Sequence, residues 1–422
     1  MTRRGNISVD HKFGAVSVIG LGYIGLPTAA MFASRKVKVL GVDVNQRAVD
    51  TINRGDIHIV EPDLDIVVRA AVSEGFLHAS TEPAPADAFL IAVPTPFKGD
   101  DKEPDLSYIE AAAKAIAPCL TKGNLVVLES TSPVGTTDKV AAWLAQARPD
   151  LSFPQDAGAE ADIKMAYCPE RVLPGRVMRE LIYNDRIIGG MSSACADAAV
   201  ELYKAFVLGE CVITNARTAE LAKLTENSFR DVNIAFANEL SLICDKLDVN
   251  VWELISLTNR HPRVDILQPG PGVGGHCIAV DPWFIVSNAP AQARIIRLAR
   301  DINDGKPAWV VEQVIAVAKS ANADGPLTIA CYGLSFKPNI DDIRESPAIE
   351  IVRSLLGSGL GDVMVIEPHI SELPPVLAGA KLVAYADAAD ADVHVMLVDH
   401  RIFADEAKPT GIIVDTRGVW SR

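Results

Sequence analysis

The sequence contains few of the residues that define disulfide-linked and metal-binding proteins. Its 422 residues include 7 Cys and 8 His, and no two cysteines have the Cys-x-x-Cys spacing of a zinc or redox site. The odd number of cysteines, spread over so long a chain, argues against a disulfide framework. We therefore expect neither such a framework nor a bound metal.

The sequence also lacks an excess of positive charge. Lys and Arg total 40 against 54 Asp and Glu, which gives a formal net charge of −14. This balance argues against nucleic acid or an anionic membrane surface as the main partner. An anionic small ligand would have to be bound by locally placed cations and helix N-termini.

Long uncharged runs are scarce, but the run from Gly14 to Ala33 follows basic residues and could be a membrane span or a signal peptide. Glycines and Pro27 interrupt this run and would break a membrane helix. Apolar residues make up 49% of the sequence and charged residues 22%, as in soluble globular proteins. We expect a soluble protein of the cytoplasm.

Short apolar runs alternate with helical patterns along the first half of the chain, which is typical of βαβ units in a parallel sheet with helices on both faces. The expected buried strands are Ala15–Ile19, Val37–Val42, Ala88–Val93 and Leu125–Leu128. The alternation returns after Pro326, with expected strands Leu327–Tyr332, Val363–Ile366, His394–Val398 and Gly411–Asp415. The predicted fold class is α/β, with two doubly wound, Rossmann-like domains.

A long helix is predicted between the two α/β regions. Residues 218–248 have a helical pattern without Gly or Pro, and such a helix, about 45 Å long, exceeds what one compact domain needs. We expect it to join the domains and to offer a dimer surface. The predicted domains are 1–208 for dinucleotide binding, 209–308 for a helical dimerisation region and 309–422 for the second Rossmann-like domain. Smaller predictions are a surface loop at Gln155–Asp162, a helix at Ala289–Ile302, and a helix from Pro347, after the N-cap Ser346, to Gly357 or Gly359.

The motif Gly20-x-Gly22-x-x-Gly25 directly follows the first expected strand and opens a helical pattern. In dinucleotide-binding folds the first glycine allows a tight turn, the second lets pyrophosphate approach the backbone, and the third lets the helix pack on the strand. Asp43 ends the next expected strand, where a carboxylate binds a ribose 2′-hydroxyl and repels a 2′-phosphate. We predict NAD, bound by Gly20, Gly22, Tyr23, Ile24, Gly25 and Asp43. The alternative is a purely structural turn, with Asp43 capping a helix.

Two further segments are expected to line the cofactor cleft, because ligands of open α/β sheets lie beyond the carboxyl ends of the strands. They are Val93–Pro96, with Pro94 and Thr95, and Glu129–Thr136, with Ser130 and Thr131. Pro, Ser and Thr also serve ordinary turns, so the spacing alone leaves both interpretations open.

Lys223 and Asn227 are four residues apart on the long helix and share one face, with Glu220 on a similar face. The loop Gly272-Val-Gly-Gly-His-Cys277 brings three glycines up to a cysteine, and Asp281 follows it. A glycine-rich approach next to an ammonium group is the setting that lowers a thiol pKa and yields a reactive thiolate. We therefore expect Lys223 to lower the pKa of Cys277. The alternatives are a solvated helix face for Glu220 and Lys223 and an inert buried thiol for Cys277.

A dinucleotide site together with an activated cysteine predicts oxidation beyond the alcohol stage. Each nicotinamide accepts one hydride, so an alcohol needs two NAD molecules to become an acid. The cysteine would hold the aldehyde as a thiohemiacetal, a second hydride transfer would give a thioester, and water would cleave it.

Along essentially its whole length the chain resembles the UDP-glucose/GDP-mannose dehydrogenase family. The matching motifs are Gly20–Pro27, Ser130-Thr131, Pro169-Glu170, Lys223 with Asn227, Gly274–Cys277 with Asp281, and Gly333–Lys337 running into Asp341–Pro347. The resemblance implies NAD-dependent four-electron oxidation of a nucleotide sugar at C6. The segments Cys168–Gly175, Asn259–Arg263 and Gly272–Phe284 resemble the branch that acts on UDP-N-acetyl-D-mannosamine, and UDP-N-acetylglucosamine is the alternative substrate.

The resemblance also implies roles for individual residues. Cys277 is the nucleophile. Lys223, with Asn227 and Asp281, assists proton transfer and stabilises the oxyanion, while Thr131 and Glu170 order the water. The further substrate contacts implied are Arg171, Val172, Arg230, His261, Arg263, Gly274, Lys337 and Arg417, and Arg344 is placed at the cofactor. Family members are dimers built on the central helix, in which Arg260 or Arg263 is the candidate for reaching the site of the other copy.

Two positions depart from the UDP-glucose branch of the family. That branch has a second Glu where this chain has Pro174, which leaves Glu170 to act without it, and Lys where this chain has Val280. Both changes favour a substrate other than UDP-glucose.

Two other functions are open on the sequence. A two-electron β-hydroxyacid dehydrogenase also has a glycine-rich N-terminal domain and a Lys-x-x-x-Asn helix, but it needs neither the cysteine loop nor a second α/β domain. An NAD-sensing binding protein without catalysis would not need Lys223, Cys277 and Asp281 together.

Overall fold

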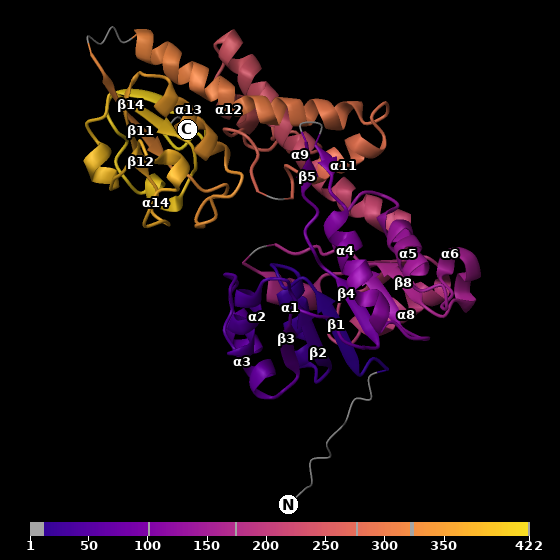
Figure 1. Cartoon of the computed structure of the whole chain (residues 1–422). Helices are drawn as coiled ribbons and strands as arrows, with labels where there is room; N and C mark the ends of the chain where they lie inside the picture. The colour runs from indigo at the N-terminus through magenta and orange to yellow at the C-terminus, as the bar shows by residue number, and fades with distance from the viewer. Residues whose placement is uncertain (1–11, 100–101, 174, 276, 321–324, 421–422) are drawn as a thin grey trace, which may run out of the picture. The chain divides into compact units, whose positions relative to one another are not determined.

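The computed structural model describes residues 12–99, 102–173, 175–275, 277–320 and 325–420. The chain divides into two units, Met1–Thr225 and Glu226–Arg422, and each contains one large, mainly parallel sheet (Figure 1). Among the described residues, no helix has both the length and the apolar composition needed to cross a bilayer.

The first unit is built on an eight-stranded sheet. In spatial order its strands are β10 (Cys211–Asn215), β9 (Arg186–Gly190), β8 (Lys164–Tyr167), β7 (Leu125–Leu128), β4 (Ala88–Ile91), β1 (Ala15–Ile19), β2 (Lys38–Val42) and β3 (Leu77–Ser80). All neighbouring pairs are parallel except β8 with β9. The strands predicted in this half are therefore confirmed, whereas the antiparallel pair was not expected from the sequence.

Helices cover both faces of this sheet, which confirms the doubly wound arrangement. One face packs against α1 (Gly25–Ser34), α2 (Gln46–Asn53), α3 (Leu64–Ser73), α7 (Val177–Tyr183) and α8 (Ser193–Tyr203). The other packs against α4 (Ser107–Ile116) and α5 (Thr136–Ala147). Within β1, Val16 and Val18 join the first core and Ile19 the second, because successive strand side chains point to opposite faces.

Short elements complete the first unit. They are the hairpin β5 (Phe97–Lys98) and β6 (Glu103–Pro104), the helix α6 (Pro154–Ala157), and the 3-10 turns η1 (Ala117–Cys119) and η2 (Gly158–Glu160). The prediction of a plain loop at Gln155–Asp162 was wrong, because α6 and η2 occupy most of it. Pro154 starts α6 at a position where its missing N–H costs no hydrogen bond.

The predicted long helix is confirmed. Helix α9 (Ala216–Leu247) has 32 residues and runs across the boundary between the two units. Its first turns, with Glu220 and Lys223, belong to the first unit, and its remainder belongs to the second.

The second unit contains α10 (Val251–Thr258), α11 (Asp281–Asn288), α12 (Arg294–Ser320) and a five-stranded parallel sheet. The strands, in spatial order, are β13 (Lys381–Leu382), β12 (Gly361–Ile366), β11 (Leu327–Tyr332), β14 (Val393–Met396) and β15 (Ile412–Asp415). Helices α12 and α13 (Pro347–Gly357) pack on one face of this sheet. The other core contains Phe403 of α14 (Arg401–Ala404), Ala388 of η4 (Tyr385–Ala388) and Trp420, whereas η3 (Pro375–Leu377) packs with α13. Ser346 caps α13 by accepting the Ala348 N–H, as predicted.

Buried polar side chains join α12 to the part of α9 in the second unit. Arg300 binds Asp231 at 2.6 Å, and the amide of Asn238 donates to Asn303 at 2.8 Å. Asn238 also accepts the N–H of Gly270 at 2.9 Å, so this network holds the start of the glycine-rich loop. The predicted helix Ala289–Ile302 starts and ends too early, because α12 begins at Arg294 and continues through Pro307 to Ser320.

Candidate active-site residues in the two units

The turn between β1 and α1 has the geometry that a dinucleotide requires. Gly20 has a φ of 92°, a left-handed conformation that favours glycine, and a Cβ there would lie 2.6 Å from the carbonyl oxygen of Ala92. At Gly25 a Cβ would lie 1.8 Å from the carbonyl oxygen of Gly20. At Gly22, by contrast, a Cβ would meet no atom within 4 Å, which leaves the backbone open to a pyrophosphate.

Asp43 lies next to this turn, directly after β2. One carboxylate oxygen accepts the N–H of Leu21 at 2.9 Å, and the other accepts the N–H of Asn45 at 2.9 Å. The side chain is half-buried, and each oxygen has a further lone pair for a ribose hydroxyl. Tyr23, 40% exposed, and Ile24, the residue before α1, complete the turn. These residues fit NAD, which accepts a hydride when bound.

The loops after β4 and β7 are joined to each other. The hydroxyl of Ser130 donates to a backbone carbonyl of the first loop at 2.7 Å. The hydroxyls of Thr95 and Ser132 are buried and have no hydrogen-bond partner among the described residues. Buried hydroxyls without partners are rare, so these loops have free capacity for a ligand. Pro94 is exposed and Thr131 is half-buried.

Glu170 follows β8 and is 7% exposed. Burial raises its pKa, and the positive charges of Arg186 and Lys223 oppose that rise. Its carboxylate accepts the N–H of Val172 at 2.7 Å, which fixes the side chain against the backbone. Arg171 donates to the carbonyl of Asp185 at 3.1 Å, and Pro174 lies outside the described residues.

Glu220 and Lys223 lie on the first turns of α9. Glu220 is fully buried, and its carboxylate accepts the N–H of Gly135 at 2.6 Å and the N–H and hydroxyl of Thr137 at 2.8 and 2.7 Å. These groups start α5, so Glu220 ties α9 to the loop that carries Thr131. The interpretation of Glu220 as part of a solvated face was therefore wrong. Lys223 is half-buried.

In the second unit, Cys277 ends the glycine-rich loop one turn before α11. Its carbonyl accepts the N–H of Asp281 at 2.9 Å, and its side chain is exposed, so the alternative of an inert buried thiol was wrong. Asp281 is 3% exposed and accepts a hydrogen bond of 2.5 Å from the amide of Asn227. Cys277, Asp281 and Asn227, three predicted catalytic residues, thus belong to one local structure. His276 lies outside the described residues.

The glycines before Cys277 allow close packing against the loop after β11. A Cβ at Gly274 would lie 2.5 Å from the carbonyl oxygen of Glu345 and 2.9 Å from Phe336. Gly275 has a φ of 82°, and a Cβ there would lie 3.0 Å from the Phe336 ring. A Cβ at Gly272 would lie 3.0 Å from Pro347. Glycine is needed here for this contact as well as for the predicted bend.

Lys337, in this loop, interacts electrostatically with Cys277. Burial lowers the pKa of Lys337, the positive charge of Arg230 lowers it further, and the Cys277 thiolate opposes both effects. The sequence placed Lys337 and Arg230 at the substrate and did not suggest this neighbour for the thiol. Lys223 belongs to the other unit, so its effect on Cys277 stays a prediction.

Two arginines predicted to bind ligands are held by neighbouring carboxylates. Arg344 donates to both oxygens of Asp342 at 2.8 and 2.6 Å. Arg417 donates to Asp399 at 2.7 Å, and the two line a hollow with Phe336. A guanidinium can bind a phosphate through two parallel hydrogen bonds. A phosphate bound here would replace these carboxylates or share the guanidinium groups with them.

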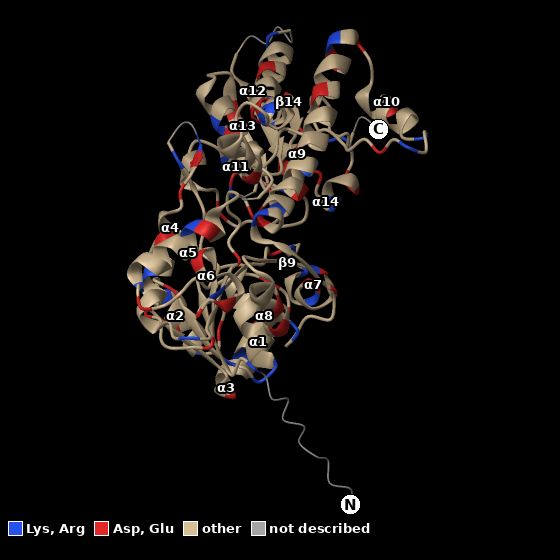
Figure 2. Cartoon of the chain, turned by 90° about the vertical axis from the view of Figure 1, so that its right-hand side faces the viewer, with Lys and Arg blue, Asp and Glu red and all other residues tan. Residues whose placement is uncertain are grey.

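The segment after α10 is exposed and basic. Arg260, His261 and Arg263 are exposed, and blue ribbon marks basic residues in the loop beside α10 (Figure 2). Asn259 closes the segment by donating to the carbonyl of Ile266 at 2.9 Å and accepting its N–H at 2.8 Å. These basic side chains are therefore presented on a closed loop.

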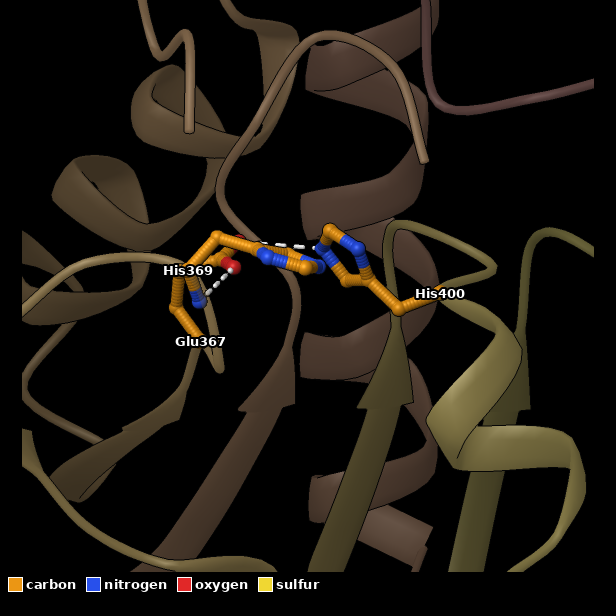
Figure 3. A group of neighbouring side chains, drawn as sticks. All are labelled: Glu367, His369 and His400. Carbon is orange, nitrogen blue, oxygen red and sulfur yellow. Dashed lines mark hydrogen bonds and ion pairs between the residues drawn. The ribbon is translucent and has the colours of Figure 1, made fainter. Parts of the chain in front are cut away.

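Glu367, His369 and His400 form the one group of metal-ligand type found among the described residues (Figure 3). The Nδ1 atom of His400 accepts the N–H of Asn339 at 2.9 Å, so its Nε2–H donates to Glu367 at 3.1 Å. Glu367 also accepts the N–H of Leu334 at 2.7 Å. Both ring nitrogens of His400 are thus engaged in hydrogen bonds, and the group holds the turn after β11.

Comparison with known proteins gives a consistent assignment. Residues 14–207 match the NAD binding domain of the UDP-glucose/GDP-mannose dehydrogenase family, residues 217–305 its central domain, and residues 330–422 its UDP binding domain. A UDP-N-acetyl-D-mannosamine dehydrogenase from Yersinia pestis is 65% identical over 422 residues, covering 97% of this chain and 100% of the relative. An NDP-N-acetyl-D-galactosaminuronic acid dehydrogenase from Ralstonia nicotianae is 63% identical over 418 residues, covering 98% of each chain.

A solved structure extends the likeness to the fold. The UDP-D-ManNAc dehydrogenase from Pyrococcus horikoshii is 40% identical and has a TM-score of 0.87, with 96% of each chain covered. The chain therefore belongs to the UDP-glucose/GDP-mannose dehydrogenase family and is an NAD-dependent nucleotide-sugar dehydrogenase.

Proposed function

We propose that this chain oxidises UDP-N-acetyl-D-mannosamine at C6 to the uronate, using two NAD and one water per sugar. The observation that carries the proposal is the exposed Cys277 beside the Asn227–Asp281 pair, in a chain that also has an NAD-binding domain. A two-electron dehydrogenase releases its carbonyl product and needs no thiol to hold it. The Yersinia pestis relative supports the sugar.

The proposed chemistry assigns each step to a residue of the chain. Lys223, with Asn227 and Asp281, moves the C6 hydroxyl proton and stabilises the oxyanion while hydride leaves the carbon. The Cys277 thiolate then attacks the aldehyde to give a thiohemiacetal. Loss of a second hydride from its carbon, with its hydroxyl proton passing to the Lys223 group, gives a thioester. Glu170, with Thr131, takes a proton from the water that attacks the thioester; the C–S bond breaks, and Cys277 leaves as thiolate.

The UDP group is proposed to bind to cations of the second unit. Lys337, Arg344 and Arg417 offer positive charge in a chain of net charge −14, and the UDP binding domain match covers all three. The proposed further substrate contacts are Arg171, Val172, Arg230, His261, Arg263 and Gly274.

A second candidate substrate has the galacto configuration. The Ralstonia nicotianae relative supports it at nearly the same identity as the mannosamine relative. UDP-N-acetylglucosamine, the alternative from the sequence, differs from the first candidate only at C2. All of these candidates share the four-electron chemistry, and substrate selectivity alone distinguishes them.

The protein is proposed to act as a homodimer through α9. Phe229, Phe236 and Ile243 are 70, 51 and 45% exposed and recur every seven residues, which places them on one helix face. An apolar stripe of this kind marks an interaction surface. The exposed Arg260 and Arg263 are the candidates for reaching the site of the other copy.

We also propose a cytoplasmic location and three functional domains, 1–208, 209–308 and 309–422. All seven cysteines are free, as is usual in a reducing compartment. The family matches end or begin near the first boundary, at residues 207 and 217.

The test measures NADH per mole of sugar across UDP-N-acetyl-mannosamine, -glucosamine and -galactosamine, UDP-glucose and GDP-mannose. We expect two NADH from the mannosamine nucleotide and the highest kcat/KM for it. Cys277→Ser should lose four-electron turnover, whereas Cys119→Ser, which changes a half-buried thiol on η1, should keep it. One NADH per sugar, or full turnover by Cys277→Ser, would overturn the proposal.

A further inference from the structure

A buried polar cluster in the first unit lies around the strand ends next to Glu170. Glu129 follows β7 and adjoins Ser130, Cys168 follows β8, Arg186 begins β9, and Tyr203 ends α8. The exposed fractions of Glu129, Cys168, Arg186 and Tyr203 are 2, 0, 4 and 0%. The proposed oxidation and hydrolysis steps give these four residues no role.

Contacts within the cluster centre on the Arg186 guanidinium. It lies 3.9 Å from Glu129 and 3.6 Å from the Cys168 sulfur, and it stacks over the Tyr203 ring at 4.7 Å. The Tyr203 hydroxyl donates to one oxygen of Glu129 at 2.5 Å, and the other oxygen is buried without a partner among the described residues. Arg186 and Glu129 are thus neighbours without the close, bidentate bonds of an ion pair.

Glu170 is a second buried carboxyl here. Tyr167 of β8 lies opposite Gly189 of the antiparallel strand β9, which puts Arg186, at the start of β9, beside the residues that follow β8. Arg186 is thus a buried cation near two buried carboxyls, Glu129 and Glu170. In a medium of low dielectric, one guanidinium supports one carboxylate, and a second like charge nearby is costly. An unbonded buried oxygen is tolerable on a neutral acid and expensive on a carboxylate. Geometry therefore favours Glu129 as the carboxyl that keeps its proton.

We propose that Arg186 and Glu129 are positioning residues that set the charge of Glu170. Arg186 keeps Glu170 ionised, ready to accept a proton from the hydrolytic water. Glu129, held as a neutral acid, leaves the charge of Arg186 to Glu170. This inference rests on the proposed role of Glu170 in thioester hydrolysis.

The other charged and titratable groups fit this assignment. Burial raises the pKa of Glu129 to about 7, although the charge of Arg186 and the hydrogen bond from Tyr203 oppose the rise, and the negative charge of Glu170 adds to it. Glu129 is therefore a neutral acid on the acid side of pH 7. Burial raises the pKa of Cys168 to about 11, so that thiol stays neutral. At Glu170, Arg186 and then Lys223 oppose burial, whereas Glu180 adds a smaller unfavourable charge.

The test follows hydrolysis of the acylated enzyme by rapid quench and intact mass, from pH 5 to 9, alongside the NADH burst. The acid limb is the fall of the hydrolysis rate toward low pH. Arg186→Met should move the midpoint of this limb upward by at least about 1 pH unit, because a neighbouring cation lowers a carboxyl pKa by that much or more. The first NADH should still appear in a burst, and acylated enzyme should accumulate. Arg186→Lys should restore part of the shift, and Glu129→Gln, which mimics the neutral acid, should keep the acid limb of the parent.

Two controls keep a loss of folding apart from the proposed effect. Arg300→Met removes an equally buried guanidinium, bonded to Asp231 in the second unit, and should lower the unfolding temperature without moving the acid limb. Arg186→Gln is the second neutral variant, in case Arg186→Met does not fold.

The outcomes separate this inference from the function on which it rests. An unmoved limb in a folded Arg186 variant, or a Glu129→Gln limb shifted like that of Arg186→Met, would overturn the inference alone. One NADH per sugar from the parent protein would overturn both.

Discussion

The two sheets carry the same turn, but only one leaves its acidic residue open. In the first unit the N–H of Gly20 donates to the carbonyl of Val42 at 2.7 Å, and Asp43 accepts the next N–H. In the second, the N–H of Gly333 donates to the carbonyl of Ile366 at 2.8 Å, and Glu367 occupies the position equivalent to Asp43. The glycines have φ values of 92° and 90°.

The two turns differ in the surroundings of the acid and in the length of chain between the glycine and the next helix. Asp43 is half-buried, whereas Glu367 is 4% exposed and closed by His400. Helix α1 begins five residues after Gly20, whereas α13 begins only at Pro347, after a loop. One turn therefore offers a carboxylate and a helix N-terminus to a dinucleotide, and the other offers the side chains of a loop with Lys337 and Arg344. A shared backbone frame does not imply a shared ligand.

The largest effect is expected from a side chain added where the first turn is tightest. Gly25→Ala would place a Cβ 1.8 Å from a backbone oxygen and should destabilise the protein by about 4 kcal/mol, as severe core clashes do. Gly22→Ala meets no atom within 4 Å and should instead weaken NAD binding while stability holds. Urea unfolding and NAD titration measure the two; equal loss of stability in both variants would contradict the geometry.

A smaller effect is expected at the closed acid. Glu367→Gln loses charge-assisted hydrogen bonds from Leu334, Ser335 and His400 and should cost about 2 kcal/mol of unfolding free energy. NAD affinity should change little, because the NAD binding domain match ends at residue 207. Urea unfolding of the variant checks this against Asp43→Asn. A stability loss at Asp43 larger than at Glu367 would reverse the comparison.

The same acid predicts a pH dependence. Burial alone would raise the pKa of Glu367, but hydrogen bonds from His400 and the Leu334 N–H outweigh it and hold the pKa below 4.5. Because the folded pKa is lower than the unfolded one, the stabilisation is present above pH 4.5 and is lost as the pH falls through the folded pKa. Unfolding free energies between pH 7 and 3.5 should fall by about 1.4 kcal/mol per unit of pKa difference. Glu367→Gln should remove that part of the slope.

The smallest effect should occur at the open acid. Asp43→Asn keeps the shape but loses the charged acceptor, so NAD affinity should fall about tenfold, the equivalent of one charged hydrogen bond. The preference of the enzyme for NAD over NADP should also fall, because the variant no longer repels the 2′-phosphate of NADP. Steady-state kinetics with both cofactors measure the ratio; an unchanged ratio would remove Asp43 from ribose recognition.

Local patterns in the sequence predicted the first turn and the long helix correctly. Gly20, Gly25 and Asp43 are within one βαβ unit, and α9 has no helix breaker, so short windows contain the necessary information. The end of α12 was missed because Pro307 normally ends a helix, whereas here the helix is packed against α9 and the second sheet.

Non-local features could not be read from spacing. Glu129 and Tyr203 are 74 residues apart, and the Glu220 bond to Thr137 spans 83. No motif marks such pairs, because only the sheet order and the position of α9 bring them together. The sequence pattern suggested that Glu220 lies on a solvated helix face. Its burial becomes evident only when the N-terminus of α5, which it contacts, is known.

If the apolar stripe of Phe229, Phe236 and Ile243 forms the proposed dimer surface, the activity of the enzyme depends on protein concentration. If a second copy covers these side chains as proposed, dilution will expose them and shift the equilibrium toward a less stable single chain. Activity per milligram should then fall on extreme dilution and recover on concentration, a mass-action signature that a self-sufficient monomer would lack.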